Sequence, residues 1–450
     1  MSESFYEVIT ELTGKGSKAQ ENFLKSCYVQ DDTKKEIFRL MLDPGIMYYI
    51  KKVPGGYDPA YSATIRKDID LLARLYTLLR DDLRGDALKN YIQDIWNQSD
   101  YDRQKTLEWV LDRKNPAKIG VALVNKVWPG LIYTQEYMGA VPGTDEALDR
   151  LPWSDGIHLQ EKIDGMTFLV EYNNGQAVDI RTRQGQSIGK YFPEFLSSCP
   201  SYFWEKGNGV FHFNGIVHHE ALVRDPEQGG YLDRKTGNGL INQQVKNAKI
   251  GGTVDNCIHT VILDIYIKGW SQEKRYKELW HFCSNRSIRV TQLLVHSEEQ
   301  AREIAQDFIR NGGEGAICKT RDGKFKNGKP WYCVKIKNEF TVDLEVIRTK
   351  PHSKRIDELG ALYCMSSDKL LGVWVNLRCD ADRLRTPYEV TGEIVQVKAE
   401  SIITSKTKGT ASLYLPRMDG SKWSEYHRPD KNRADSLNDI KSQYKASKGI

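Results

Sequence analysis

Apolar residues in the first third of the chain recur at helical spacing. Phe5, Val8, Ile9 and Leu12 follow an i, i+3, i+4, i+7 pattern, which is typical of one buried helix face. A longer segment of the same kind runs from about Arg66 to Leu83, and Gly85 is expected to end it. The pattern also predicts helices near residues 37–42, 103–111 and 121–127. We therefore expect an all-α domain over residues 1–132.

The pattern changes to strands and turns from about residue 157 onward. A linker with several prolines is expected over 133–156. After it, the sequence predicts an α+β domain over 157–340, with strands at 166–172, 177–183, 209–223, 260–266, 315–319 and 331–337 and helices at 192–205, 271–284 and 297–311. Residues 341–432 contain further strands without clear helices, spaced as in a small β-barrel, and a polar tail completes a domain over 341–450.

Composition and charge narrow the class of protein. At 450 residues the chain is expected to fold as two to four domains. Its eight cysteines are scattered without a Cys-x-x-Cys pair, which disfavours a zinc ribbon or a disulfide framework and favours a reducing compartment. The start of the sequence has no apolar core of a signal peptide, and no apolar run approaches membrane-spanning length. We therefore expect an intracellular protein without a membrane partner.

Basic residues in the helical region suggest a surface for phosphates. Lys51 and Lys52 follow two tyrosines, and Lys114 and Lys118 precede Gly120 at the expected start of a helix that carries Lys126. Free backbone N–H groups at a helix start favour an anion, and phosphate contacts of this kind position a duplex without reading its sequence. The formal net charge of +5 does not decide the matter, since solvated lysines on a helical bundle give the same pattern.

The candidate chemistry begins at Lys162. In Lys162-x-Asp164-Gly165 an extended backbone would place the first two side chains on one face, and a lysine in a pocket can act as a nucleophile. Taken alone, the string is more typical of an exposed turn. Further charged residues interrupt the later strands, and edge strands with solvated charges explain each one separately; they are Arg183, Glu220, Glu314, Lys335 and Lys337. Together the set suits nucleotidyl transfer, with the carboxylates holding a divalent metal.

The order of these residues resembles that of the covalent nucleotidyltransferases, a family that contains ATP-dependent DNA ligases, RNA ligases and mRNA capping enzymes. The helical region and the segment 125–132 resemble the amino-terminal domain of T-even bacteriophage DNA ligases. Ser412 to Arg417, followed by Arg428-Pro429-Asp430-Lys431, is similar to the last ligase motif. The resemblance implies a helical DNA-binding domain, an ATP-grasp-like adenylation domain and a C-terminal OB-fold domain.

The resemblance also implies a role for each site residue. Lys162, within the motif that contains Asp164 and Gly165, would attack the α-phosphate of ATP. Gln160 would read the adenine, near the position taken here by Leu263 where relatives have an aromatic residue. Arg183 and Glu220 would contact the ribose, and Glu220 and Glu314 would hold Mg²⁺, with Mn²⁺ able to substitute. The expected phosphate-binding residues are Lys335 and Lys337 for the α-phosphate, and Arg417, Arg428, Asp430 and Lys431 for pyrophosphate.

We expect a monomer that seals 5′-phosphate/3′-hydroxyl nicks in duplex DNA, and two alternatives stay open. Many DNA ligases carry an arginine at the position of Thr167, whereas RNA ligases often have a small polar residue there. A ligase for RNA or for RNA-containing nicks is therefore the second hypothesis. A catalytically silent DNA-end-binding protein is the third, although it does not explain why all the charged motifs are present. A capping enzyme would leave the helical region unexplained, and an NAD-dependent ligase would need a four-cysteine zinc site.

Overall fold

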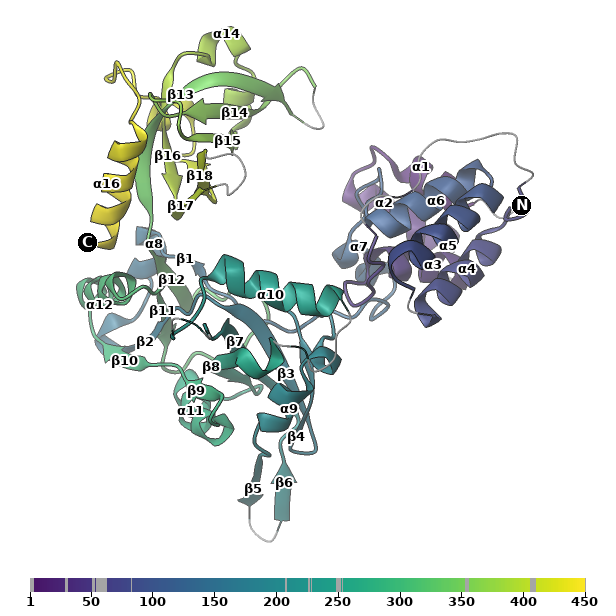
Figure 1. Cartoon of the computed structure of the whole chain (residues 1–450), viewed down its shortest axis with the longest axis horizontal. Helices are drawn as coiled ribbons and strands as arrows, with labels where there is room; N and C mark the ends of the chain where they lie inside the picture. The colour runs from purple at the N-terminus through teal and green to yellow at the C-terminus, as the bar shows by residue number, and fades with distance from the viewer. Residues whose placement is uncertain are drawn as a thin grey trace. The chain divides into compact units, whose positions relative to one another are not determined.

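The computed structural model describes most of the chain. The described residues are 4–28, 31–50, 53, 63–81, 83–206, 209–225, 227, 229–247, 252, 254–352, 356–404 and 410–449. They divide into two compact units, each assembled from separate stretches of the sequence. Figure 1 labels their helices and strands. The first unit comprises Met1–Tyr137, Met166–Thr260 and Ser284–Arg286, and the second comprises Met138–Gly165, Val261–Cys283 and Ser287–Ile450.

The described elements of the first 127 residues are helices. They are α1 (Phe5–Leu12), α2 (Ser17–Tyr28), α3 (Asp32–Leu42), α4 (Asp68–Arg80), α5 (Gly85–Gln98), α6 (Tyr101–Asp112) and α7 (Val121–Val127). Their apolar faces meet in one core that includes Phe5, Ile9 and Phe38. The sequence interpretation missed α2 and α5, and it was wrong about Gly85. Helix α4 already ends at Arg80, and Gly85, with a left-handed φ of 57°, is the first residue of α5.

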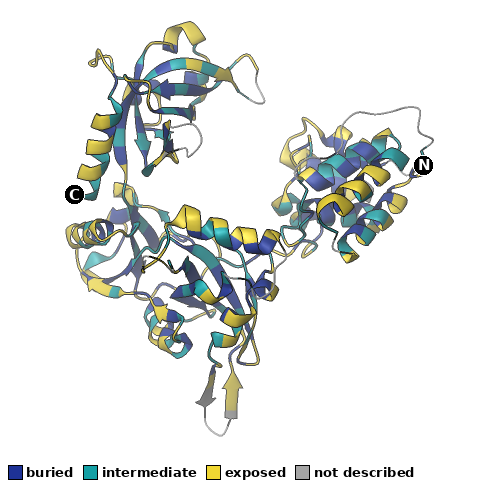
Figure 2. Ribbon diagram, viewed as in Figure 1, coloured by how far each residue is buried: buried dark blue, intermediate teal, exposed yellow. Residues whose placement is uncertain are grey.

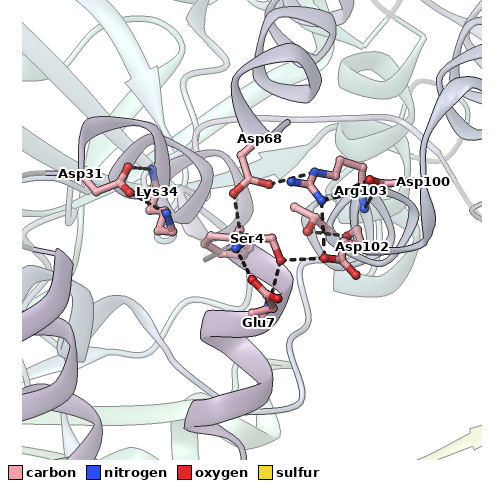
Figure 3. Close-up of polar contacts among 10 residues, drawn as sticks. Ser4, Glu7, Asp31, Lys34, Asp68, Asp100, Asp102 and Arg103 are labelled. Atoms are coloured by element: carbon pink, nitrogen blue, oxygen red, sulfur yellow. Dashed lines mark hydrogen bonds and ion pairs between the residues drawn. The ribbon is translucent and has the colours of Figure 1, made fainter. Parts of the chain in front are cut away.

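Buried polar groups fix the start of α1 in this core (Figure 3). The Ser4 side chain caps the helix in a reciprocal capping box with Glu7, and its hydroxyl also donates to Asp102 at 2.8 Å. The N–H of Phe5 donates to Asp68 at 2.7 Å, and Asp68 lies 3.3 Å from Arg103. Burial raises the pKa of Asp68, although Phe5 N–H and Arg103 oppose that shift. This network joins α1, α4 and α6, so it specifies how these helices pack.

Besides its helices, the first unit contributes strands to a five-stranded sheet. Strands β3 (Met166–Asn173), β4 (Gln176–Arg181), β7 (Gly215–Val223), β8 (Ile258–Tyr266) and β9 (Ser287–Arg289) form a sheet in the order β4-β3-β7-β8-β9, and β8 passes from the first unit into the second. Residues 209–223, predicted as one strand, form β6 (Gly209–His212) and β7 instead. The predicted helix at 192–205 is only α9 (Pro193–Ser198), followed by β5 (Phe203–Lys206), which pairs with β6. Helix α10 (Arg234–Lys246) contacts β7.

The second unit contains the sheet that carries Lys335. Strands β1 (Val141–Pro142), β2 (Ile157–Glu161), β10 (Gln292–Val295), β11 (Gly315–Thr320) and β12 (Cys333–Lys337) are ordered β1-β12-β11-β2-β10. Helix α12 (Glu298–Arg310) covers one face with Ala301 and Ala305, and α8 (Asp145–Asp149) adds Leu148 to the same core. Figure 2 shows buried positions in these strands and exposed ones on the outer side of the helices. Helix α11 (Gln272–Glu278) follows β8.

The rest of the second unit is a second sheet with short helices. Strands β13 (Phe340–Pro351), β14 (Leu359–Met365), β15 (Gly372–Asn376), β16 (Ile394–Ala399) and β19 (Arg417–Met418) are ordered β15-β14-β13-β16-β19, beside the hairpin β17 (Ser401–Thr404) and β18 (Ala411–Tyr414). Against the expectation of no helices before the tail, α13 (Asp380–Arg383), α14 (Pro387–Val390) and α15 (Trp423–Tyr426) lie in its connections. Helix α16 (Leu437–Lys448) follows and packs Ile440 into the core.

Candidate active site

The sheet β1-β12-β11-β2-β10 of the second unit has one apolar face and one polar face. Directly paired residues run in one row across four strands, from Gln292 through Gln160 and Ile317 to Lys335. Residues that pair directly share a face, so Gln160 and Lys335 point the same way. The intervening positions, such as Leu159, face the apolar core under α12. Strand alternation therefore separates a packed face from a polar face that carries the candidate site.

Lys162 lies just beyond the end of β2 rather than within a strand. Its backbone N–H donates to the carbonyl of Gly315 at 2.9 Å, which fixes the start of the loop that contains Asp164 and Gly165. Its ammonium group pairs with Oε2 of Glu314. Glu314 precedes β11, so it is a loop residue and not, as expected, a residue of the strand. The second oxygen of Glu314 lies 2.6 Å from Nζ of Lys337.

The Lys162 cluster, formed by Lys162, Glu314 and Lys337, extends to Glu400 and lies beside Lys335. Nζ of Lys337 lies 2.9 Å from Glu400, a residue that the sequence analysis did not single out. Burial opposes the charge of Lys337, but its bonds to Glu314 and Glu400 outweigh burial and raise its pKa. Burial lowers the pKa of Lys335, and the like charges of Lys337, Lys329 and Lys162 lower it further. Like charges therefore disfavour the charged form of Lys335, and an anionic ligand would stabilise it.

The carboxylate of Glu314 is charged in this arrangement. Burial alone would raise its pKa, but the charges and hydrogen bonds of Lys162 and Lys337 outweigh burial and lower it. The side chain of Lys162 is 20% exposed, and those of Glu314 and Lys337 are 14% and 13% exposed. All three are thus largely desolvated but accessible from one side, as a site that receives a charged substrate requires.

Gln160 is held by neighbours on both sides. Its amide donates to the side chain of Gln292 at 2.9 Å and approaches the carbonyl of Leu263 at 3.5 Å. Gln160 is only 2% exposed. The pairing across β2 and β10 fixes the amide on the polar face, and Gln292 was not singled out from the sequence. Asp164 is half-buried in the loop after Lys162, and Gly165 is buried.

A second group of charged residues, on the polar face of the same sheet as Gln160, is buried. The Asp264 cluster consists of Asp264, Arg275 and Lys319: Nε of Arg275 lies 2.7 Å and Nζ of Lys319 lies 3.2 Å from the Asp264 carboxylate. Arg275 also donates to the carbonyls of Trp270 and Gly323. Burial would raise the pKa of Asp264, but Lys319 and Arg275 lower it to about 2. The sequence did not reveal this cluster, because its members are distant along the chain.

Glu220 and Arg183 belong to the first unit. Glu220 is 9% exposed on β7, and Thr167, its directly paired residue on β3, donates its hydroxyl to Oε1 at 3.0 Å. Nε2 of His218 lies 3.5 Å from the same oxygen. Arg183 was expected to end a strand, but β4 ends at Arg181 and Arg183 lies in the following turn.

An aromatic residue connects these groups. The guanidinium of Arg183 lies 4.4 Å from the ring centre of Tyr137, and that ring packs edge-on against His218 at 5.4 Å. The stack of Arg183, Tyr137 and His218 thus leads to the carboxylate of Glu220. Oε2 of Glu220 accepts no hydrogen bond from the described residues, so it is open to a ligand.

The C-terminal candidates are tied to carboxylates in the second unit. Arg417 pairs with Glu339. Nη1 of Arg428 lies 3.2 Å from Asp343, and its Nη2 lies 2.7 Å from Asp430. Nζ of Lys431 lies 3.5 Å from Asp343. Asp343, which is 6% exposed on β13, therefore binds two of these basic residues, Arg428 and Lys431.

The basic residues of the helical region lie at its surface where they are described. Lys114, Lys118 and Gly120 are exposed, and Gly120 is the N-cap of α7 without a side-chain cap. Lys126 lies 2.6 Å from Glu21, which also binds Lys25 at 2.8 Å. The charge of Lys126 is therefore partly neutralised by Glu21. Lys51 and Lys52 lie outside the described residues.

Carboxylates suited to a divalent metal are present, but they do not form a closed cage. Among the described residues there is no group of three or more histidine, cysteine, aspartate or glutamate side chains placed to hold a metal. Mg²⁺ commonly takes only one or two protein carboxylates and completes its shell with phosphate and water. The open oxygen of Glu220 fits that kind of ligand, whereas both oxygens of Glu314 are occupied by lysines.

Comparison with known proteins finds similarity to DNA ligases. Residues 140–337 match the family model of the ATP dependent DNA ligase domain. The chain is 24% identical to the DNA ligase of enterobacteria phage T4 over 395 residues, covering 80% of this chain and 81% of that protein. It is 23% identical to the DNA ligase of enterobacteria phage T6 over the same length and the same shares of the two chains.

Solved structures share the fold. The structure named Pmar-Lig_PreS3 superposes with a TM-score of 0.68 at 15% identity, covering 92% of this chain and 98% of that one. Pmar-Lig_Pre. gives the same TM-score at 14% identity. No helix among the described residues is both long enough and apolar enough to cross a membrane. Residues 140–337, which include Lys162, Glu314, Lys335 and Lys337, thus match the ATP dependent DNA ligase domain, and the chain is similar to phage DNA ligases over 80% of its length.

Proposed function

We propose that this chain seals 5′-phosphate/3′-hydroxyl nicks in duplex DNA with ATP. The observation that carries the proposal is the Lys162 cluster. In it a partly exposed lysine pairs with the carboxylate of Glu314, and a second lysine, Lys337, pairs with the same carboxylate. In the first step Nζ of Lys162, after losing a proton, attacks the α-phosphorus of ATP. The bond to the β-phosphate oxygen breaks, and pyrophosphate leaves. A lysyl-AMP phosphoramidate remains on the enzyme.

The next two steps transfer AMP through the DNA. The 5′-phosphate at the nick attacks the phosphorus of lysyl-AMP, so the P–N bond breaks and Lys162 is regenerated. The 3′-hydroxyl then attacks the adenylated 5′-phosphate, loses its proton and expels AMP, which closes the phosphodiester bond. Negative charge develops on phosphate oxygens in each step, and nearby cations stabilise it. Lys335 and Lys337 supply such charge on the polar face of the sheet.

The remaining roles follow from the resemblance and stay proposals. Gln160 reads the adenine beside Leu263, and Asp164 and Gly165 shape the loop that presents Lys162. In the first unit Arg183 and Glu220 contact the ribose. Arg417, Arg428, Asp430 and Lys431 orient pyrophosphate. Since Asp343 and Glu339 hold three of these basic residues, their release is part of the proposed step.

Mg²⁺ is the proposed metal, with Mn²⁺ able to replace it. Glu220 would hold it through its open oxygen, and Glu314 would contribute once a lysine moves to the substrate. The ion supplies positive charge that offsets the charge of the phosphates. Thr167 and His218 would orient Glu220 for either metal, because both contact its Oε1 and leave Oε2 for the ion.

DNA binding is proposed for the helical region and for the C-terminal sheet. The division into a helical DNA-binding domain (1–132), a linker (133–156), an adenylation domain (157–340) and an OB-fold domain (341–450) stays a prediction, as does a monomeric state. Lys51, Lys52, Lys114, Lys118, Gly120 and Lys126 are the proposed phosphate contacts. Replacing Lys114 and Lys118 with alanine should flatten the salt dependence of duplex binding by up to about 1.8 log units per log unit of salt. An unchanged slope would exclude both lysines.

The direct test of the enzymatic proposal uses ATP labelled at the α-phosphate. Enzyme freed of bound AMP, incubated with Mg²⁺ and without DNA, should give an acid-labile labelled band on a denaturing gel. Lys162→Ala should abolish this band, while Lys114→Ala serves as a control that keeps it. No adduct on the wild-type enzyme would contradict the proposal.

A ligase for RNA-containing nicks is the second candidate. The observation that favours it is Thr167, which occupies the place beside Glu220 where many DNA ligases have an arginine. A panel of nicks with DNA/DNA, RNA/DNA and RNA/RNA strands separates the two candidates. Faster sealing of all-DNA nicks supports the leading proposal, and much faster sealing of all-RNA nicks would replace it with the second.

A further inference from the structure

The outer face of the C-terminal sheet carries a row of cationic and aromatic side chains. Arg348 on β13 pairs directly with Tyr363 on β14, and Tyr363 pairs directly with Trp374 on β15. The three side chains therefore share one face. A β-bulge between Val346 and Arg348 places Arg348 on that face. The alternate residues of β14 and β15, such as Leu362 and Val373, face the apolar core.

The row is a contiguous surface, which we call the Trp374 face (Arg348, Lys350, Tyr363 and Trp374). The rings of Tyr363 and Trp374 lie 5.1 Å apart. The guanidinium of Arg348 lies 4.5 Å from the Tyr363 ring, and Nζ of Lys350 lies 4.9 Å from the Trp374 ring. A Cβ atom at Gly372 would collide with the Tyr363 hydroxyl, so the glycine allows the tyrosine to lie along the sheet.

Among the described residues, no carboxylate pairs with either cation of this face. Arg348 and Lys350 are exposed, and neither forms an ion pair with a carboxylate of the described residues. Many other surface cations are paired, such as Arg383 with Asp380 at 2.6 Å. Exposed cations without an acidic partner lose little free energy when they move from an aromatic ring to a phosphate. The face of the ring is then free to stack on another planar group.

The ligand that matches this chemistry has flat bases and regularly spaced phosphates. Bases stack on aromatic side chains, and phosphates bind lysine and arginine, in many proteins that hold single strands. A duplex does not fit in the same way, because its bases are already stacked on one another. We propose that the Trp374 face binds unpaired, single-stranded DNA. This binding goes beyond nick sealing, since a nick has no unpaired base.

The test measures binding of a labelled single-stranded oligo(dT) to the full-length protein by fluorescence anisotropy over a range of salt. Trp374→Leu should weaken binding at least about fivefold, as expected from loss of one stacked base, and leave the salt slope unchanged. Trp374→Phe should recover most of the affinity, because it keeps a stacking face. The double variant Arg348→Ala/Lys350→Ala should flatten the slope by about 1.4, or about 0.7 per phosphate contact.

A matched control removes two other exposed cations of the same unit. Lys441→Ala/Lys445→Ala, on α16, should leave oligo(dT) affinity within about twofold of the wild type. Self-adenylation of every variant confirms that the catalytic domain is folded, and it separates failure of this proposal from failure of the proposed ligase reaction. Binding of Trp374→Leu within twofold of wild type would overturn the proposal. Equal losses in Trp374→Leu and Trp374→Phe would overturn it too, as would tighter binding of oligo(U) than of oligo(dT).

Discussion

The second unit holds two clusters with the same arrangement of charges in different surroundings. In each, one carboxylate lies between two cations: Glu314 between Lys162 and Lys337, and Asp264 between Arg275 and Lys319. The side chains of the Asp264 cluster are 0% to 8% exposed, whereas those of the Lys162 cluster are 13% to 20% exposed.

The two clusters also differ in how many hydrogen bonds tie their cations to the rest of the fold. Arg275 donates to two backbone carbonyls and to Gln272 besides Asp264, so the cluster joins β8, α11 and the loop after β11. It is complete without a ligand. Lys162, in contrast, pairs with Glu314 and keeps a side chain that is 20% exposed. The same three charges thus stabilise the fold in one place and remain available for chemistry in the other.

The largest expected effect on stability comes from replacing each carboxylate by its amide. Asp264→Asn leaves two buried cations uncompensated and should lower the free energy of unfolding by about 3–5 kcal/mol. Glu314→Gln leaves Lys162 and Lys337 within reach of water and should cost only about 1 kcal/mol. Urea denaturation followed by circular dichroism measures both. Equal losses would show that the two clusters do not differ as described.

The same pair of variants should reverse its order in catalysis. Glu314→Gln removes the partner that orients Lys162, so self-adenylation should slow by roughly a hundredfold. Asp264→Asn, assayed at a temperature where it is folded, should change that rate by less than about threefold. The rate of formation of the labelled adduct under single-turnover conditions is the measurement. A stronger effect of Asp264→Asn would place its cluster in the active site.

A smaller effect concerns acid. The pKa of Asp264 is about 2 in the folded chain against an ordinary value of 3.8. Because the folded pKa is the lower one, the ion pairs contribute fully above pH 3.8, and their contribution is lost as the pH falls towards 2. As the pH falls between these values, the unfolding free energy of Asp264→Asn should decrease less steeply than that of the wild type. The difference in slope should correspond to the uptake of up to about one proton on unfolding. Parallel slopes would contradict the assignment.

Local pattern was enough to predict some elements and not others. The helical faces around Phe5 and Ile37 and the strand at Met166–Asn173 follow directly from apolar spacing. Gly85 misled, because a glycine taken as a helix stop can instead be the first residue of the next helix. Residues 209–223 contain the dipeptide Asn214-Gly215, a turn signal that the strand prediction overlooked, and the chain turns there between β6 and β7.

Contacts between distant residues account for what the sequence could not give. The order of charged residues singled out Lys162 and Glu314, yet their ion pair depends on the pairing of β2 with β11. Gln292 and Glu400 contact Gln160 and Lys337 only through the fold. Thr167 is the reverse case. The sequence marked it as unusual, and the structure adds that its hydroxyl binds Glu220.

The central claim is that Lys162, and neither of the lysines beside it, forms the bond to AMP. Tandem mass spectrometry of proteolytic peptides tests it directly, after the AMP-free enzyme reacts with ATP and Mg²⁺ at neutral to alkaline pH. The account predicts AMP on the peptide that contains Lys162, and no adduct in Lys162→Arg, which keeps the charge beside Glu314. AMP on Lys335 or Lys337, or an adduct that persists in Lys162→Arg, would contradict it.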